Sequence, residues 1–318
     1  MEKITLLNSA LKIEPGTFKN AIKIFRTEGF MSFLKKLVDA IILIVKRFFR
    51  EYLVLKFIYL KSNKGEITKK IHGNPMILDL NDLGISRELA IYGEHEHNST
   101  NEVKKLVKPG MKILEVGANI GYYAVLETKL AGENGYLYAI EPSPFNFNLL
   151  KRNIGLNKIK NAEIYQKAAG AEKEMAKFYV ANKSNLSSFI KRDDMDMYHN
   201  GKIIDVEIIK LDDFLENKTV DFIRMDVEGY EKEILKGMEG TMKTQHPKHF
   251  FIEIHSELLH KKDSSAREIL DYLNKFGYEV IKSFYRGNSK TAASDAKELL
   301  THPLLETGYW ETFFEYKG

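Results

Sequence analysis

The 318-residue chain contains no cysteine, one tryptophan and seven prolines. The absence of cysteine excludes disulfide bonds, thiolate metal sites and a cysteine nucleophile, so any catalysis must use other groups. The segment from Met1 to Gly16 lacks the apolar stretch and small-residue cleavage site of a secretory signal. We therefore expect a cytoplasmic protein. With 44% hydrophobic residues, the chain is long enough to bury one large core and to carry an accessory segment.

The net charge of +4 is distributed unevenly along the chain. Residues 1–64 hold 13 Lys and Arg against 5 Asp and Glu, so this segment carries +8 and the remainder −4. Such asymmetry indicates that the N-terminal part, rather than the body, meets an anionic surface or partner. Alternatively, these basic residues form a solvated surface that binds no partner.

Apolar residues recur every three or four positions between Phe33 and Leu60, with Lys46, Arg47 and Arg50 opposite them. This spacing predicts one long amphipathic helix. Because charges interrupt it, no stretch of about 18 apolar residues remains to span a membrane. The helix is expected either to lie peripherally on the inner membrane face or to pack on its own domain or a second subunit. Residues 1–65 are thus a basic helical segment.

The remainder, residues 66–318, is predicted to form one α/β domain. A hairpin at 66–80 and two short helices come first, and strands then alternate with helices. This alternation is typical of a doubly wound, mainly parallel sheet. An inserted hairpin is predicted at about 174–209. The predicted strands are Lys112–Val116, Tyr136–Glu141, Ala162–Lys167, Asp221–Asp226, His249–His255, Tyr278–Phe284 and Trp310–Tyr316, with helices at Gly121–Leu130, Pro144–Leu156 and Tyr230–Met238.

A glycine-containing loop follows the first of these strands. Gly117 and Gly121 let the backbone turn tightly and approach a ligand, while Glu115 and Asn119 offer hydrogen-bonding groups. A dinucleotide-binding loop needs glycine at its first, third and sixth positions, but Asn119 and Tyr122 occupy the last two. An acidic residue before the loop suits instead the cationic methionine end of S-adenosylmethionine.

A second carboxylate ends the next strand, roughly 20 residues beyond the loop. Glu141 can accept hydrogen bonds from both hydroxyls of a ribose there, and Pro142 stops the strand. In this order and spacing, the loop and Glu141 together predict an adenosylmethionine site.

Several motifs give the chain a family resemblance. They are Pro109-Gly110, Glu115 to Tyr123, Ala139 to Pro144, Asn153 with Leu156-Asn157, and Asp221 to Glu231. Together they resemble the FkbM-type methyltransferases over roughly Met76 to Glu257. The resemblance implies the class I methyltransferase fold with a seven-stranded sheet, adenosylmethionine as donor, and O-methylation of a sugar or natural-product hydroxyl.

The resemblance also implies contacts for the cofactor. Glu115, Gly117, Asn119 and Gly121 are expected to line the methionine end, Glu141 and Pro142 the ribose, and Ala168 the adenine edge. Glu96, in a Glu-x-x-x-Thr spacing with Thr100, is expected to close the site.

Polar residues at the ends of the fourth and fifth strands are the candidates for catalysis. Asp226 and Glu228 leave one strand, and Glu253 and His255 leave the next, although strands inside a parallel sheet are normally apolar. We expect His255 or Asp226 to be the general base, with Glu253 orienting it or binding the acceptor. The alternative is a structural network that includes Arg224, whose side chain should share a face with Asp226.

A metal-assisted reaction is a further alternative, since these side chains could bind Mg²⁺ or Mn²⁺. No recognised metal spacing is present, and no metal site is predicted. The expected acceptor is a small molecule or glycan, bound in part by residues 182–189. Two rival functions are an inactive scaffold of the same fold and a nucleic-acid methyltransferase. The acidic body has no basic stripe with interleaved aromatics, so nucleic acid is not an expected partner.

Overall fold

The computed structural model describes residues 30–181, 183–191, 202–286 and 291–318. Contacts divide the chain into two units, residues 1–62 and 63–318. The first unit contains one described element, the helix α3 (Phe30–Leu60). This 31-residue helix confirms the predicted long helix. It exposes many large apolar side chains, among them Met31, Phe49, Tyr52 and Phe57. Among the described residues, no helix is both long and apolar enough to cross a membrane.

The second unit begins with the predicted hairpin. Strand β1 (Glu66–Ile71) pairs antiparallel with β2 (Asn74–Asp79). His72 and Gly73 form the turn with φ angles of 48° and 83°. Two successive positive φ angles match the twist of a two-residue hairpin loop, which is why glycine stands at the second position.

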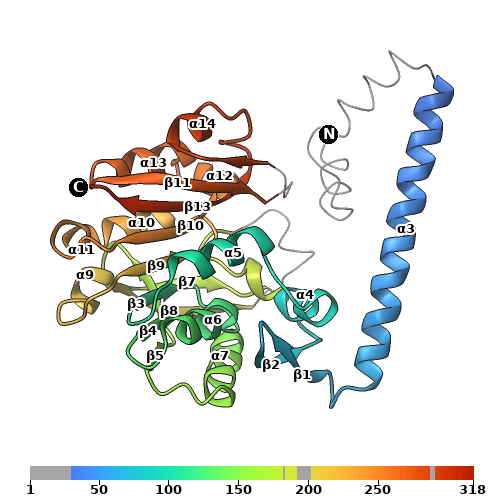
Figure 1. Ribbon diagram of the computed structural model, residues 1–318, viewed down its shortest axis with the longest axis horizontal. Coiled ribbons are helices and arrows are strands. Elements are labelled where there is room, and N and C mark those ends of the chain that lie inside the picture. The colour runs from blue at the N-terminus through green and yellow to red at the C-terminus, as the bar shows by residue number, and fades with distance from the viewer. Residues whose placement is uncertain (1–29, 182, 192–201, 287–290) are drawn as a thin grey trace. The chain divides into compact units, whose positions relative to one another are not determined.

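A mixed sheet of eight strands forms the centre of this unit. Every strand predicted from Lys112 onward is present, which confirms the doubly wound architecture (Figure 1). The expected number of seven strands is wrong by one, because an edge strand of only two residues is too short to show a period in the sequence. The strands β13 and β12 run against their neighbours. In spatial order the strands are β12 (Ala292–Ala293), β11 (Tyr278–Tyr285), β13 (Tyr309–Tyr316), β10 (His249–His255), β9 (Phe222–Met225), β3 (Lys112–Val116), β4 (Tyr136–Ile140) and β5 (Ala162–Tyr165).

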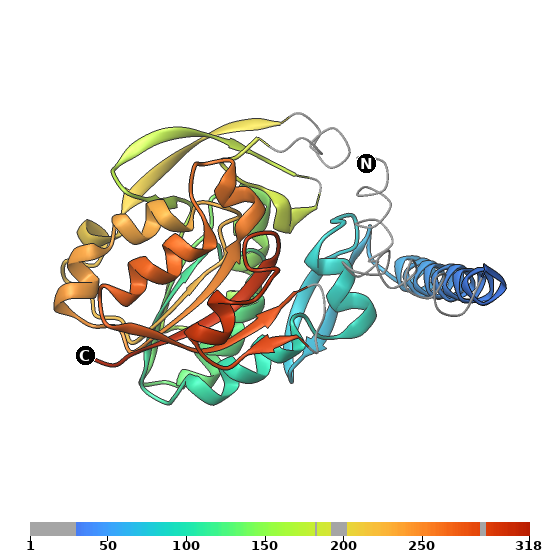
Figure 2. The same ribbon diagram turned by 90° about the horizontal axis from the view of Figure 1, so that it is seen from above.

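Helices cover both faces of the sheet (Figure 2). One face carries α5 (His97–Leu106), α6 (Tyr122–Ala131) and α7 (Pro144–Leu156), and the other α10 (Glu231–Lys236), α11 (Glu239–Thr244) and α13 (Ala266–Asn274). The predicted helix Tyr230–Met238 is thus the shorter α10, and α11 follows it. The remaining described helices are α4 (Ile85–Tyr92), α9 (Leu211–Phe214), α12 (Ser256–His260), α14 (Ala296–Leu300) and the 3₁₀ turn η1 (Ser184–Leu186).

The insertion differs from its prediction in one respect. Its two strands, β7 (Glu174–Tyr179) and β8 (Ile203–Lys210), pair antiparallel as expected. A third strand, β6 (Ala168–Gly170), pairs parallel with β8, so the insertion is a three-stranded sheet. Three apolar or small residues gave the sequence too little periodicity to indicate β6.

The two faces of the central sheet differ chemically. Side chains alternate along each strand, and one face is apolar, with Leu114, Ile223 and Ile252 in the main core. The face beneath α5 and α6 includes Glu115 and Arg224, which are direct neighbours in the β3–β9 register. Both are buried. Charge therefore lies inside the protein under the helix layer.

Asn153 links three segments that form the edge of the domain. The side chain of Asn153, fully buried in α7, accepts from the Ile77 N–H at 2.7 Å and donates to the carbonyls of Ile77 and Ile120 at 3.3 and 2.8 Å. It thereby joins β2 to α7 and to the loop after β3.

Replacing Asn153 by Ala should lower the free energy of unfolding by about 2–4 kcal/mol, because buried backbone groups lose their partners. Urea denaturation measures this change. The Asn101→Ala variant, which loses only an exposed hydrogen bond to His97, serves as control and should cost less than about 0.5 kcal/mol. Equal effects of the two substitutions would show that Asn153 does not join these segments.

Candidate active site

A cavity opens at the carboxyl ends of β3, β4 and β9. This is the position where the chain order reverses in the sheet, and where ligands bind in open α/β folds. The predicted site residues that line it are Gly117, Asn119, Glu141, Pro142, Ala168, Asp226 and Glu228. The structure therefore brings most of the predicted cofactor residues and two predicted catalytic residues to one place, while their roles stay predictions.

Gly117 is required by a close approach of two backbones. Its φ is +84°, and a Cβ at this position would lie 2.0 Å from the carbonyl oxygen of Asp226. The Asp226 N–H also donates to the Val116 carbonyl at 3.0 Å. The loop after β3 thus touches the loop after β9 directly. Gly117 therefore helps to set the position of the Asp226 backbone at the cavity.

Glu141 organises the opposite wall. Its carboxylate accepts from the backbone N–H groups of Asn119 and Ser143, each at 2.8 Å, and from the Asn146 amide at 3.4 Å. Burial raises the pKa of Glu141 to about 7, although these hydrogen bonds oppose the shift. A carboxylate has about four acceptor positions, so capacity remains for a ligand hydroxyl.

Two amide groups at the cavity have unused hydrogen-bonding capacity. The Oδ1 atoms of Asn146 and Asn185 are buried and have no hydrogen-bond partner within the described ranges. Asn185 belongs to the predicted acceptor segment, of which residue 182 lies outside the described residues. Sequence reasoning missed Asn146 and the ring of Phe178, which also line the cavity. Only the packing of the insertion against α7 brings them there.

Three predicted cofactor residues lie elsewhere. The cavity lining, as far as the structure describes it, does not include Glu115, Gly121 or Glu96. Gly121, with a φ of +90°, precedes α6 and faces Leu150. Glu115 and Glu96 belong to a buried charge cluster, defined here as Glu96, Glu115, Arg224, Glu253 and Arg286.

Arg224 is the centre of the buried charge cluster. Its guanidinium donates to Glu115 at 3.0 Å, to Glu253 at 3.2 Å and to Asp226 at 3.3 Å. It also lies 4.1 Å above the ring of Tyr123. Burial disfavours its charge, but the carboxylates, Glu115 first, keep the pKa of Arg224 well above its ordinary value. The predicted shared face of Arg224 and Asp226 is confirmed.

Glu253 lies between two arginines. Arg286 donates to it at 2.6 Å and forms an ion pair with Glu96 at 3.1 Å. Burial, together with the nearby Asp226 and Glu96, raises the pKa of Glu253 well above its ordinary value. Because both of its oxygens bind arginine, Glu253 is placed to position its neighbours, and its predicted role toward the acceptor stays a prediction.

Beside Glu115, α6 contributes the fully buried Glu127. Burial and the adjacent Glu115 raise the pKa of Glu127 well above its ordinary value. Sequence reasoning gave no indication of this buried side chain.

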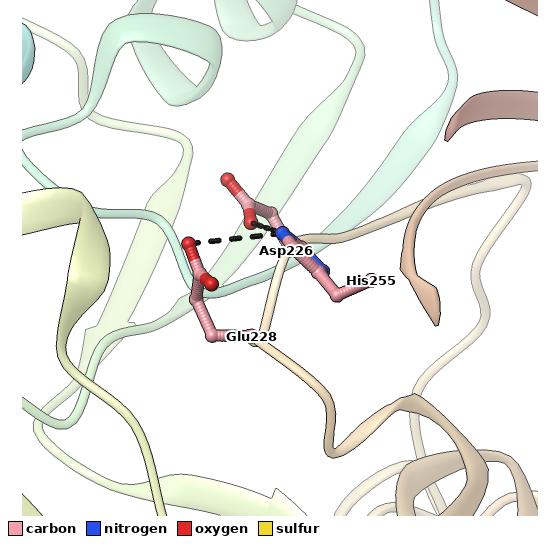
Figure 3. A group of neighbouring side chains, drawn as sticks. All are labelled: Asp226, Glu228 and His255. Carbon is pink, nitrogen blue, oxygen red and sulfur yellow. Dashed lines mark ion pairs between the residues drawn. The ribbon is translucent and has the colours of Figure 1, made fainter. Parts of the chain in front are cut away.

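Asp226 and Glu228 belong to the cavity wall, and their side chains converge with that of His255 (Figure 3). The Nε2 atom of His255 lies 3.8 Å from Asp226 Oδ1 and 3.7 Å from Glu228 Oε1. Its Nδ1 is hydrogen-bonded to Glu231 at 2.7 Å. Burial opposes a charged ring, but Glu228 and Glu231 outweigh it and raise the pKa of His255 to about 10. Glu228 has a φ of +52°, a strained value that aims its side chain at this group.

His95 and Glu96 form a second buried pair beside α5. His95 contacts Glu96 at 2.7 Å and Glu88 at 3.1 Å. Burial opposes the charged ring, yet these carboxylates raise the pKa of His95 from 6.5 to about 10. Thr100 contacts the backbone of His95 and the hydroxyl of Tyr122. The Glu-x-x-x-Thr spacing therefore fixes the start of α5.

The proton on His95 should make unfolding depend on pH. Below pH 6.5 the folded and unfolded chains both hold this proton, and its stabilising effect is complete. Between pH 6.5 and about 10 only the folded chain holds it, so the free energy of unfolding falls by at most about 1.4 kcal/mol per pH unit. Above pH 10 the effect is lost. The difference in unfolding free energy between wild type and His95→Gln should therefore shrink between pH 7 and 9.5. Urea denaturation across this range tests it, with the exposed His97→Gln as control. A difference that does not change with pH contradicts the pairing.

Comparison with known proteins adds a family and several distant relatives. A family model described as the methyltransferase FkbM domain matches residues 115–280. Methyltransferase 1 of Beauveria bassiana is 24% identical over 145 residues, which cover 40% of this chain and 58% of that protein. Protein-L-isoaspartate O-methyltransferase of Methanothrix thermoacetophila is 33% identical over 58 residues, or 18% of this chain and 28% of that protein. The chain thus spans less than two thirds of either relative.

Solved structures also show similarity at low identity. TYW2 from M. jannaschii in complex with AdoMet has a TM-score of 0.39 and 16% identity, covering 80% of this chain and 89% of that chain. A SAM-dependent methyltransferase from Aquifex aeolicus has a TM-score of 0.38 and 16% identity, covering 69% and 89%.

The family match spans more than half of the sequence and includes the loop after β3, Glu141 and the Asp226 to Glu231 segment. The strand order of the central sheet, with β13 antiparallel between β10 and β11, is that of the predicted class I methyltransferase fold. The chain therefore belongs to the FkbM methyltransferase domain family.

Proposed function

We propose that this protein is an adenosylmethionine-dependent O-methyltransferase that acts on a hydroxyl of a sugar, glycan or other small molecule. The observation that carries the proposal is the cavity at the switch point of the sheet, where Gly117, Glu141 and Asp226 meet in a chain of this family. The acidic wall supplies groups for both a cationic donor and a hydroxyl acceptor.

The residues of the cavity fit the donor in its chemistry. Glu141 has acceptor capacity for ribose hydroxyls, and the unpaired amide oxygens of Asn146 and Asn185 are available to donors on a ligand. Ala168 and Phe178 give the cavity an apolar side suited to an adenine ring. When bound, adenosylmethionine supplies a methyl group whose bond to sulfur breaks as its bond to the acceptor oxygen forms, leaving adenosylhomocysteine.

The chain must still remove the acceptor proton, because an alcohol does not ionise by itself near neutral pH. Asp226 lines the cavity, and its side chain is 19% exposed. Arg224 holds Oδ2 of Asp226, so Oδ1 is directed toward His255. His255 is only 1% exposed and lies behind Asp226. We therefore assign proton removal to Asp226, with His255 as its positioning residue.

A nucleic-acid acceptor is less consistent with these groups. The chain beyond residue 64 carries −4, and the cavity wall contributes Asp226 and Glu228. Phosphate backbones are bound by surplus Lys and Arg, and like charges repel them. An inactive scaffold is distinguished by its failure to produce adenosylhomocysteine.

Replacing Asp226 by Asn should reduce adenosylhomocysteine formation roughly 100- to 10,000-fold, since the proton acceptor is lost. Donor affinity, measured by isothermal titration calorimetry, should change little, because Glu141 and the loop after β3 are unaltered. Extracts of glycans and metabolites provide the acceptor, and a labelled donor makes the methyl transfer detectable.

The exposed Glu257→Gln variant near His255 is the matched control and should keep wild-type turnover. Near wild-type turnover of Asp226→Asn would remove the assigned role. Absence of donor binding by the wild type would remove the proposed function itself.

The helix α3 suggests where the acceptor is found. It exposes large apolar side chains along its length, and residues 1–64 carry +8. We propose that this segment lies on an anionic membrane surface, where apolar burial and charge attraction act together. A lipid-linked sugar is then a suitable acceptor.

The full chain should co-sediment with vesicles that contain anionic lipid and much less with neutral vesicles. Neutralising Lys46, Arg47 and Arg50 together should reduce binding by about 1 kcal/mol per charge. Lys158, Lys160 and Lys173, which lie in the second unit, provide a control triple variant of equal charge. Equal loss in both variants would mean that overall charge, rather than this helix, causes binding.

A further inference from the structure

We propose that Asp226, Glu228 and His255 form a binding site for a divalent cation of the Mn²⁺ or Mg²⁺ class. Each residue offers one ligand atom, and the three atoms lie within 4.8 Å of one another. Figure 3 shows one ring nitrogen of His255 facing an oxygen of each of the two carboxylates.

The separations suit a shared ion. Two ligands that each lie about 2.1 Å from a metal are roughly 3.0 Å apart when adjacent and 4.2 Å apart when opposite. The distances from His255 Nε2 to Asp226 and Glu228 are 3.8 and 3.7 Å, between these limits. They are too long for hydrogen bonds, so these two carboxylates interact with the His255 ring through charge alone.

His255 is held in the orientation of a metal ligand. Its Nδ1 is hydrogen-bonded to Glu231 Oε1 at 2.7 Å, and Glu231 is fully buried. Metal-binding histidines almost always donate their second ring N–H to a carboxylate or carbonyl in this way. The Nε2 atom, in a side chain 1% exposed, has no hydrogen-bond partner in the part of the chain that the structure describes. A buried polar atom without a partner within the protein is open to a ligand such as an ion.

The local charge also favours a cation. Four carboxylates, those of Asp226, Glu228, Glu231 and Glu253, have an oxygen within 3.8 Å of the His255 ring nitrogens. The buried Arg224 binds Asp226 and Glu253 on the side away from the ring and also shares its charge with Glu115. Carboxylates gathered around one point in a buried site are stabilised by positive charge among them, which a bound cation would supply.

The donor set indicates the kind of ion. Two carboxylates and one imidazole are a hard, mostly oxygen set, which suits Mg²⁺ and Mn²⁺, and the imidazole makes Mn²⁺ the better probe. Asp226 and Glu228 line the cavity, so the remaining coordination positions face the place proposed for the acceptor. The geometry thus matches a site with positions open to substrate.

A role for the ion in the reaction rests on the proposed function. A cation here would lower the pKa of an acceptor hydroxyl, so that its O–H bond breaks more readily, the electron pair stays on oxygen and the proton passes to Asp226. Binding of the ion needs neither donor nor acceptor and can be tested alone.

Mn²⁺ binding to the full chain tests the site directly. The protein is freed of metal with EDTA, dialysed and titrated with MnCl₂ without donor or acceptor, and free Mn²⁺ is followed by electron paramagnetic resonance. We expect one saturable site per chain. Asp226→Asn, Glu228→Gln and His255→Ala should each abolish it, and Glu231→Gln, which alters only the positioning residue, should weaken it 10- to 100-fold.

Glu257→Gln is the matched control and should bind Mn²⁺ as the wild type does. A pulsed measurement on the wild-type Mn²⁺ complex should detect coupling to an imidazole nitrogen, which needs no variant to fold. No saturable binding by the wild type, no nitrogen coupling, or unchanged binding by folded His255→Ala would each overturn the site. Mn²⁺ binding without methyl transfer would support the metal site and contradict the proposed function. Methyl transfer without metal and without Mn²⁺ binding would support the proposed function and contradict the metal site.

Discussion

The buried guanidinium of Arg224 is the interaction on which the centre of the domain depends. It stacks on the ring of Tyr123 and joins carboxylates from β3, β10 and the loop after β9. A buried charge is costly unless it is paired and hydrogen-bonded, so these partners must all be present in the folded state. Loss of one partner would leave the others with uncompensated charge.

The same pairing arranges the candidate site. Because Arg224 occupies one oxygen of Asp226, the other oxygen is directed toward His255, which Glu231 holds from behind. Glu253 lies between Arg224 and Arg286 and separates the two positive groups. The groups proposed to act at the cavity wall are therefore held by the buried charge cluster. A substitution in that cluster would affect the wall through Asp226.

The close approach of Gly117 to the Asp226 backbone links the proposed donor and acceptor ends of the cavity. One wall belongs to the loop after β3 and to Glu141, and the other to the loop after β9. Since these loops touch, their contact would set the distance between a donor bound at the first loop and Asp226. Such fixed positioning is what methyl transfer, an alignment problem, requires.

The sequence by itself determined the seven longer strands of the central sheet, the helices between the first of them and the loop after the first strand, because these follow from local periodicity and backbone freedom. It also indicated Glu141, Asp226 and His255 from their places at strand ends. Only the tertiary structure decided that Glu115 and Glu96 turn into the buried charge cluster and that Glu231 holds His255. The partners of these carboxylates lie far away in sequence: Glu115 pairs with Arg224, 109 positions on. Which way a buried charge turns depends on the nearest opposite charge in space, and local pattern contains no information about it.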